Sequence, residues 1–302
     1  MSNGQTQTEQ YQKEQAQKSM ETRRNKVIIK KVITHIIVLA IGFVMIYPLI
    51  WMVMSSFKES SVIFHDPGLI PQSWYLGNYT TGWAGIGGRH TFRTFFSNSF
   101  FYAGTATFGM VLSSSMIAYS FSRGQYRGRK VLFGLMIGTL LLPAQVLMVP
   151  QYLWFHRLGW VGSYIPLIVP AFFGGAFFIF LITNFMNAIP RELDESAKID
   201  GCSFYGIYIR IVMPLSVPAL ITAGLFSFIW RWDDFMGPLL YIGRPANFPV
   251  TLALRVFADP TSITNWGAFF AMSTLSLLPA ILIFIFFQRY LVEGISTSGL
   301  KG

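Results

Sequence analysis

The chain has little charge and almost no cysteine. Of its 302 residues, 12% are charged and one is a cysteine, Cys202, whereas 53% are hydrophobic and 17% are aromatic. A single cysteine excludes an internal disulfide and any cysteine-based metal cluster. The low charge and the mean hydropathy of +0.48 exclude a soluble domain of this length. The composition therefore predicts an integral membrane protein.

A catalytic or nucleotide-binding constellation is also missing from the sequence. The four histidines are scattered, and none has the spacing of a zinc-binding pair. Residues 294–301 resemble a phosphate-binding loop only superficially, because Leu300 displaces the lysine and Gly302 stands where Ser or Thr is required. We expect no enzyme activity in this chain, and neither a metal nor a cofactor bound to it.

Long uncharged stretches separate the charged residues, and a helix needs about 20 apolar residues to cross a bilayer. Six stretches meet this requirement, so we expect an all-α membrane protein with six transmembrane helices. They cover residues 32–57, 94–122, 131–156, 158–190, 211–230 and 260–288.

The distribution of Lys and Arg predicts the orientation of these helices. A cytoplasmic N-terminus places most of the basic residues on the cytoplasmic side and puts both termini there. This asymmetry and contact with anionic lipid account for the net charge of +10, so nucleic acid is not an expected partner. The expected parts are a disordered cytoplasmic tail over 1–31, which lacks the features of a cleavable signal, a transmembrane domain over 32–293 and a cytoplasmic C-terminal tail over 294–302.

A polar elbow over residues 190–214 interrupts two apolar stretches. Pro190 suits the first turn of a helix, and acidic residues follow where they complement the positive end of the helix dipole. Gly201 can supply the left-handed conformation that stops a helix. The pattern predicts a short helix over 191–200.

The second half of the elbow also has helix signals. Ser203 can cap a helix over 204–212, which Pro214 would end before the chain re-enters the membrane. An amphipathic helix lying on the lipid surface is one interpretation of the elbow. Its acidic first turns are unfavourable beside anionic lipid, so a protein partner is favoured.

The elbow also carries a family resemblance. Glu195, Ala197, Gly201, Ile211 and Pro214 have the spacing that marks permease subunits of bacterial binding-protein-dependent ABC importers. Ser196 and Met213 stand where that pattern has Ala and Leu. The resemblance extends over nearly the whole chain from about residue 32. It is closest to the shorter permease subunit of the maltose-type carbohydrate importers.

This resemblance implies a type I importer architecture in the bacterial cytoplasmic membrane. The implied partners are a homologous permease, an ATPase dimer that binds ATP and Mg²⁺, and an extracytoplasmic sugar-binding protein. Residues 294–302 would reach between the ATPase subunits, and 241–265 would enter the binding protein. The cargo would be an oligosaccharide, with a pectin- or plant-cell-wall-derived one as an option. The implied ATPase-coupling residues are Glu195, Ser196, Ala197, Asp200, Gly201, Ile211 and Pro214.

A second cluster lies in the fifth predicted span, where ionised groups are costly unless they are paired or hydrated. In one interpretation Arg231 pairs with an aspartate and fixes a gate. In the other, Trp232 stacks on a sugar ring while Asp233 or Asp234 accepts hydroxyl protons. An ion-coupled secondary transporter that uses these two aspartates is the alternative function. The candidate substrate-path or gate residues are Trp230, Arg231, Trp232, Asp233, Asp234 and Phe235.

Overall fold

A computed structural model describes residues 3–66, 68–85, 90–258 and 265–299. The regular secondary structure of these residues is helical, joined by turns and loops, and they contain no β-strand. The long helices are α1 (Asn3–Ser55), α3 (Phe92–Arg123), α5 (Ala144–Arg157), α7 (Ala176–Ala188), α11 (Val217–Trp232) and α14 (Trp266–Gly299). The shorter α-helices are α2 (Gly77–Ala84), α4 (Arg129–Thr139), α6 (Ile165–Ile168), α8 (Glu192–Ile199), α9 (Phe204–Ile207), α10 (Met213–Leu215), α12 (Met236–Tyr241) and α13 (Val250–Phe257). Two 3₁₀ segments, Val169–Phe173 and Pro245–Asn247, and a π-helical turn, Tyr208–Val212, complete the set.

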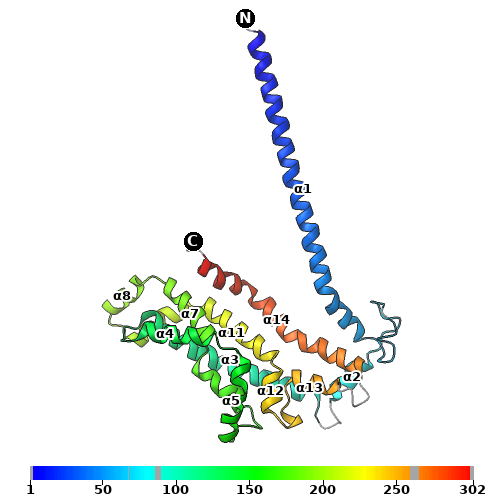
Figure 1. Cartoon of the computed structure of the whole chain (residues 1–302), viewed down its shortest axis with the longest axis vertical. Coiled ribbons are helices and arrows are strands. Elements are labelled where there is room, and N and C mark those ends of the chain that lie inside the picture. The colour runs from blue at the N-terminus through cyan, green and yellow to red at the C-terminus, as the bar shows by residue number, and fades with distance from the viewer. Residues whose placement is uncertain (1–2, 67, 86–89, 259–264, 300–302) are drawn as a thin grey trace.

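Helices α3, α7 and α11 form the centre of the molecule, with α4 and α8 towards one end and α2 and α13 towards the other (Figure 1). Helix α5 turns away from α4 and packs against α12 through Tyr152, Phe155 and Tyr241. Ala106 and Ala223 are fully buried in the core that these three helices share. Small side chains at such positions let helix backbones approach closely, which is the usual way that transmembrane helices pack. The core therefore holds the helices that connect the two ends of the molecule.

In the described part of the chain, four helices are long and apolar enough to cross a membrane, and the number rises to six if two bent pairs each count as one span. The upper figure agrees with the six predicted spans, two of which are then broken. α4 and α5 meet at 97°, because Pro143 holds an extended conformation before α5 begins. The segment 204–215 and α11 meet at 75°. The predicted straight spans over 131–156 and 211–230 are therefore corrected to bent ones.

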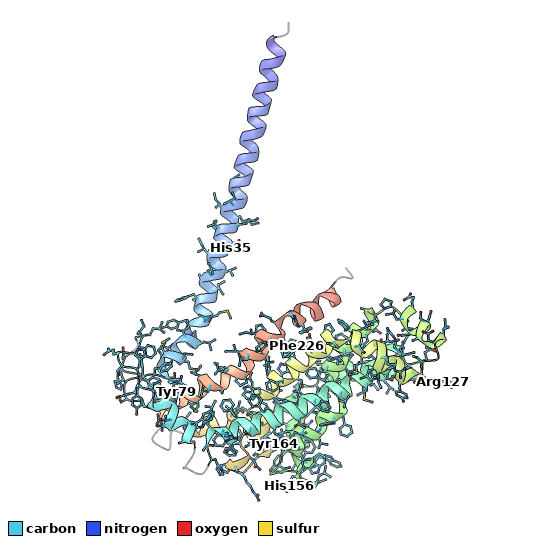
Figure 2. All side chains as sticks on the ribbon, turned by 180° about the vertical axis from the view of Figure 1, so that it is seen from behind. His35, Tyr79, Arg127, His156, Tyr164 and Phe226 are labelled. Carbon is cyan, nitrogen blue, oxygen red and sulfur yellow. The ribbon has the colours of Figure 1, made fainter. Side chains whose placement is uncertain are left out.

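Helix α1 projects away from the other helices as a long rod (Figures 1 and 2). It begins at Asn3, so the structure continues the helix through most of residues 1–31, where the composition predicted a disordered tail. The physical reason is that this stretch lacks proline and is rich in Gln, Glu and Lys, which favour helix. At the other end, α14 extends to Gly299, and residues 300–302 of the predicted C-terminal tail lie outside the described residues.

Candidate functional site

The first half of the elbow folds as the sequence predicts. Helix α8 ends in a Schellman motif, in which Gly201 has a φ of 81°. The amide of Gly201 donates to the carbonyl of Lys198 at 3.0 Å, and the amide of Cys202 donates to the carbonyl of Ala197 at 2.9 Å. These two bonds satisfy carbonyls that the helix end would otherwise leave unpaired. The chain can therefore reverse tightly into the second half of the elbow.

The second half begins as predicted and ends differently. The hydroxyl oxygen of Ser203 accepts from the amide of Gly206 at 3.1 Å and caps α9. Helical structure then continues through a π turn to Leu215, so the expectation that Pro214 ends it is wrong. The wide π turn, Tyr208–Val212, changes the hydrogen-bonding register, and the proline falls in the first turn of α10, where it needs no amide hydrogen. The chain bends after α10, next to Ser216.

A buried ion pair fastens α8 to the end of α3. Arg123 Nε lies 2.5 Å from Asp194 Oδ2, and the two side chains are 5% and 8% exposed. The guanidinium also donates to the carbonyls of Met186 at 3.0 Å and Ile189 at 2.9 Å, at the end of α7. One arginine thus joins the ends of α3 and α7 to the start of the elbow.

The geometry of this pair makes charge its main contribution. Arg123 Nε and Asp194 Oδ1 have no hydrogen-bond partner among the described residues, so the short contact is ionic rather than a well-directed hydrogen bond. Sequence reasoning missed the pair, because Arg123 was counted only as a basic residue of a loop. The spacing of three residues shows that Asp194 and Ala197 share one face of α8, but it does not identify Arg123 as the partner.

Aromatic side chains make a second attachment between the elbow and α3. The hydroxyl of Tyr119 donates to the carbonyl of Phe204 at 2.9 Å, and the two rings lie 4.6 Å apart. The Tyr119 ring also lies 4.9 Å from that of Tyr208, whose hydroxyl is 2.7 Å from the Ser115 hydroxyl. Both halves of the elbow are therefore held on the same helix, so that a push on α8 would reach α3 directly.

The predicted coupling residues divide between the two faces of the elbow. Ala197 faces inward with Asp194, and Ile211 is half-buried. The outward-facing members are exposed, and they are Glu195, Ser196, Asp200, Gly201 and Pro214. Sequence reasoning missed Ile199, an apolar side chain on α8 that is 87% exposed. The exposed residues of α8 therefore include acidic side chains, Lys198 and two apolar side chains, of which Ile199 projects furthest and Leu193 is 42% exposed.

The tryptophans of the second cluster have different surroundings. Trp232 is 3% exposed, and its indole nitrogen donates to the carbonyl of Ser276 at 3.0 Å. Its ring packs 4.8 Å from Phe100, so the expectation that Trp232 stacks on a sugar ring does not fit this packing. Trp230 is half exposed and packs against Phe177 at 5.2 Å. Of these two tryptophans, Trp230 has an exposed ring surface and Trp232 does not.

The charged members of the cluster do not form the ion pair that one interpretation of the sequence expected. Arg231 donates to the hydroxyl of Ser227 at 3.0 Å, and among the described residues it forms no ion pair with an aspartate. Asp234 accepts from the hydroxyl of Tyr102 at 2.9 Å and from the amide of Gly237 at 3.0 Å. One guanidinium nitrogen of Arg231 bonds within its own helix, and its buried Nε has no hydrogen-bond partner among the described residues. Asp234 instead links the end of α11 to α3.

The location of the cluster is also different from the prediction. α11 ends at Trp232, with the exposed Asp233 as its C-cap, so the two aspartates lie in the break before α12 rather than within the span. Phe235 lies in the same break, with the guanidinium of Arg255 5.5 Å from the centre of its ring. Within the described part of the chain, no group of three His, Cys, Asp or Glu residues is arranged to hold a metal ion.

Comparison with known proteins identifies the same class of transporter. The family described as the binding-protein-dependent transport system inner membrane component matches residues 110–297. A probable ABC transporter permease protein, YurM, of Bacillus subtilis is 35% identical over 85% of this chain and 84% of its own length. The arabinooligosaccharides transport system permease protein AraQ of Halalkalibacterium halodurans is 28% identical over 87% of this chain and 93% of its own. The trehalose/maltose transport system permease protein MalG of Thermococcus litoralis is 29% identical, with coverages of 91% and 98%.

A solved structure has the same fold. It belongs to a bacterial ABC transporter involved in the import of the acidic polysaccharide alginate, and it matches with a TM-score of 0.77. The match covers 87% of this chain and 96% of that chain at 20% sequence identity. The family match covers more than half of the chain and includes the second half of α3, α7, α11 and the elbow. The chain therefore belongs to the family of inner membrane components of binding-protein-dependent ABC transport systems.

Proposed function

We propose that this chain is a permease subunit of an ATP-driven carbohydrate importer in the bacterial cytoplasmic membrane. It forms half of the translocation path together with a homologous second permease. A separate ATPase dimer binds ATP and Mg²⁺, and an extracytoplasmic binding protein delivers the sugar. Relatives named for arabinooligosaccharides and for trehalose/maltose support a carbohydrate cargo. We propose an oligosaccharide, and a pectin- or plant-cell-wall-derived one is our specific hypothesis.

The observation that carries this proposal is the two-sided character of α8. Its inner face is buried and tied to α3 by the ion pair between Arg123 and Asp194. Its outer face exposes Glu195, Ser196 and Ile199. Ile199 follows Glu195 by four residues and Ser196 by three, so it lies about one turn from each of them. A helix that is firmly attached on one face and exposed on the other suits contact with a moving partner.

The proposed mechanism follows from this attachment. When the ATPase dimer closes around ATP, it displaces α8, and α3 moves with α8 because the two are joined through a buried contact. The rigid core helices would convert that displacement into a switch between inward-facing and outward-facing cavities. The chain's own residues transmit force and line the path, and the hydrolysis takes place in the partner.

Charge reversal at the elbow tests the coupling role. In the purified transporter complex, we expect Glu195→Lys to reduce substrate-stimulated ATP hydrolysis to the basal rate, because it reverses the charge offered to the partner. Arg127→Glu is the matched control, since Arg127 is also exposed and lies in the turn between α3 and α4, outside the elbow. We expect this control to keep its stimulation.

Two results would overturn the proposal. Wild-type stimulation in Glu195→Lys would remove the coupling role from this face of α8. Uptake that continued without the ATPase and stopped when the proton gradient was collapsed would instead favour the ion-coupled transporter. The cargo is tested separately, by mass spectrometry of the glycan that co-purifies with the cognate binding protein, and a non-carbohydrate ligand there would contradict the carbohydrate assignment.

A further inference from the structure

A cavity of about 560 Å³ lies beside the turn between α3 and α4, next to the start of the elbow. Its volume is within the range of ordinary ligand sites. Arg129, Lys130 and Arg191 line it, together with Tyr126 and Gln125, and no carboxylate is among the described residues that form its wall. Arg191 also borders a second pocket, which Asp194 and Glu195 line. Three cations on a wall that has no carboxylate of its own favour an anion in the cavity.

Backbone hydrogen bonds hold two of these cations on the cavity wall. Arg129 donates to the carbonyl of Gly124 at 2.9 Å, and Arg191 donates to the carbonyl of Ser122 at 3.2 Å. Each guanidinium has five N–H donors, so most of its donors stay available to a ligand. A pair of guanidiniums suits phosphate oxygens, which they can bind in bidentate fashion. A phosphate group therefore suits the charge and the donors of this cavity wall best.

The surroundings of the cavity indicate where this phosphate comes from. α4 continues from the cavity with apolar, exposed side chains, and Val131 and Leu135 are 66% and 65% exposed. α4 and α5 together are long and apolar enough to form a bent membrane span, so these exposed apolar side chains suit contact with hydrocarbon. Tyr126 is 40% exposed, as is typical of an amphipathic ring at the level of lipid headgroups.

Figure 2 labels Arg127 in the same turn and shows it at one extremity of the helical bundle. Figure 1 shows α8 at this same end, close to α4. The elbow side is the side that the distribution of Lys and Arg predicts to be cytoplasmic, where anionic lipid attracts basic residues. A headgroup bound here would have its acyl chains along α4 and its phosphate beside Arg191, the residue that precedes α8.

We propose that this cavity is a binding site for the phosphate headgroup of an anionic phospholipid. Arg129 and Arg191 bind the phosphate oxygens, Lys130 adds a third positive charge, and the acyl chains lie against the exposed side of α4. The bound lipid connects the turn between α3 and α4 to Arg191, at the start of the elbow.

Native mass spectrometry of the whole transporter complex tests the site. The complex is exchanged into micelles that contain equal amounts of phosphatidylglycerol and phosphatidylcholine, and the ratio of retained lipids is measured. We expect preferential retention of phosphatidylglycerol, and a roughly tenfold lower preference in Arg129→Gln, because one charge-assisted contact is lost. Lys130→Gln reduces the preference less, since a single flexible ammonium contributes fewer bonds.

Arg127→Gln is the matched control, because it removes one positive charge from the same turn at a residue that does not line the cavity. We expect it to retain the wild-type preference. Arg129→Lys keeps the charge and the fold and should give an intermediate value. Size-exclusion profiles show whether each complex remains assembled.

Three results would overturn the proposal. An equal loss in Arg127→Gln would mean that diffuse surface charge attracts the lipid. An unchanged preference in an assembled complex that carries both Arg129→Gln and Lys130→Gln would place the lipid elsewhere. Full displacement of phosphatidylglycerol by millimolar inorganic phosphate would identify a site for a soluble anion. None of these results bears on the coupling role of α8, which is tested by ATP hydrolysis.

Discussion

The buried pair between Arg123 and Asp194 makes the coupling mechanism quantitatively testable. Asp194→Asn removes the negative charge and leaves the guanidinium buried, with its bonds to Met186 and Ile189 intact. Loss of one partner of a buried pair costs on the order of 3–5 kcal/mol. We take the lower end, about 3 kcal/mol, because the arginine keeps its carbonyl partners. This loss of free energy weakens the attachment between α8 and α3.

Hydrogen exchange measures this attachment locally. If the free energy of opening α8 falls by about 3 kcal/mol, its amides exchange roughly a hundredfold faster, because each 1.4 kcal/mol is a factor of ten. We expect this acceleration over Glu192–Ile199 in the purified complex, together with weaker stimulation of the ATPase. Glu195→Gln is the control on the exposed face of the same helix. It should leave the exchange rates of α8 unchanged.

A double substitution separates charge from packing. Arg123→Met with Asp194→Leu leaves no unpaired charge in the site, so we expect its α8 to exchange more slowly than that of Arg123→Met alone. The reasoning is refuted if the α8 amides of Asp194→Asn exchange at the wild-type rate. It is refuted equally if the α8 amides of the double variant exchange faster than those of both single variants. The pair would then contribute through shape and not through charge.

Two further predictions concern the turn of the elbow and the end of α11. Gly201→Ala should lower the stability of the elbow by about 1–2 kcal/mol, because a side chain strains the left-handed backbone although nothing lies within 4 Å of the added carbon. Gly201→Asn should lower the stability less, because asparagine tolerates this conformation better. Equal thermal melting of the two variants and the wild type would contradict this prediction. Tyr102→Phe removes the hydroxyl that donates to Asp234, so we expect slower transport without faster exchange in α8. Asp234→Asn should behave similarly, whereas Asp233→Asn, the exposed neighbour, serves as the matched control. Wild-type transport in both Tyr102→Phe and Asp234→Asn would contradict a role of this hydrogen bond in transport.

Much of the fold followed from local sequence signals. The number of spans came from the spacing of charges, and the stop at Gly201 and the cap at Ser203 came from residue types with strong backbone preferences. The family was predicted from five residues of the elbow at fixed spacing. Where local signals competed, the prediction was wrong: Pro214 was taken as a helix stop, although a π turn before it lets the helix continue.

Contacts between distant residues could not be predicted in this way. Arg123 and Asp194 are separated by a whole bent span and α7, and no periodic pattern relates them. The sequence identified Trp232 as a candidate for sugar contact by its residue type, but only its packing against Phe100 and its bond to Ser276 show that its ring is covered.

By itself, the sequence determined that this is a membrane protein of helices with a short polar elbow, because hydropathy and helix-stop signals act locally along the chain. The tertiary structure decided which face of that elbow is attached and which is exposed. It also decided which charged residues find partners and which surround the cavity beside α4. These properties depend on the meeting of α3, α7 and α8, and burial and pairing arise only when such helices are packed together.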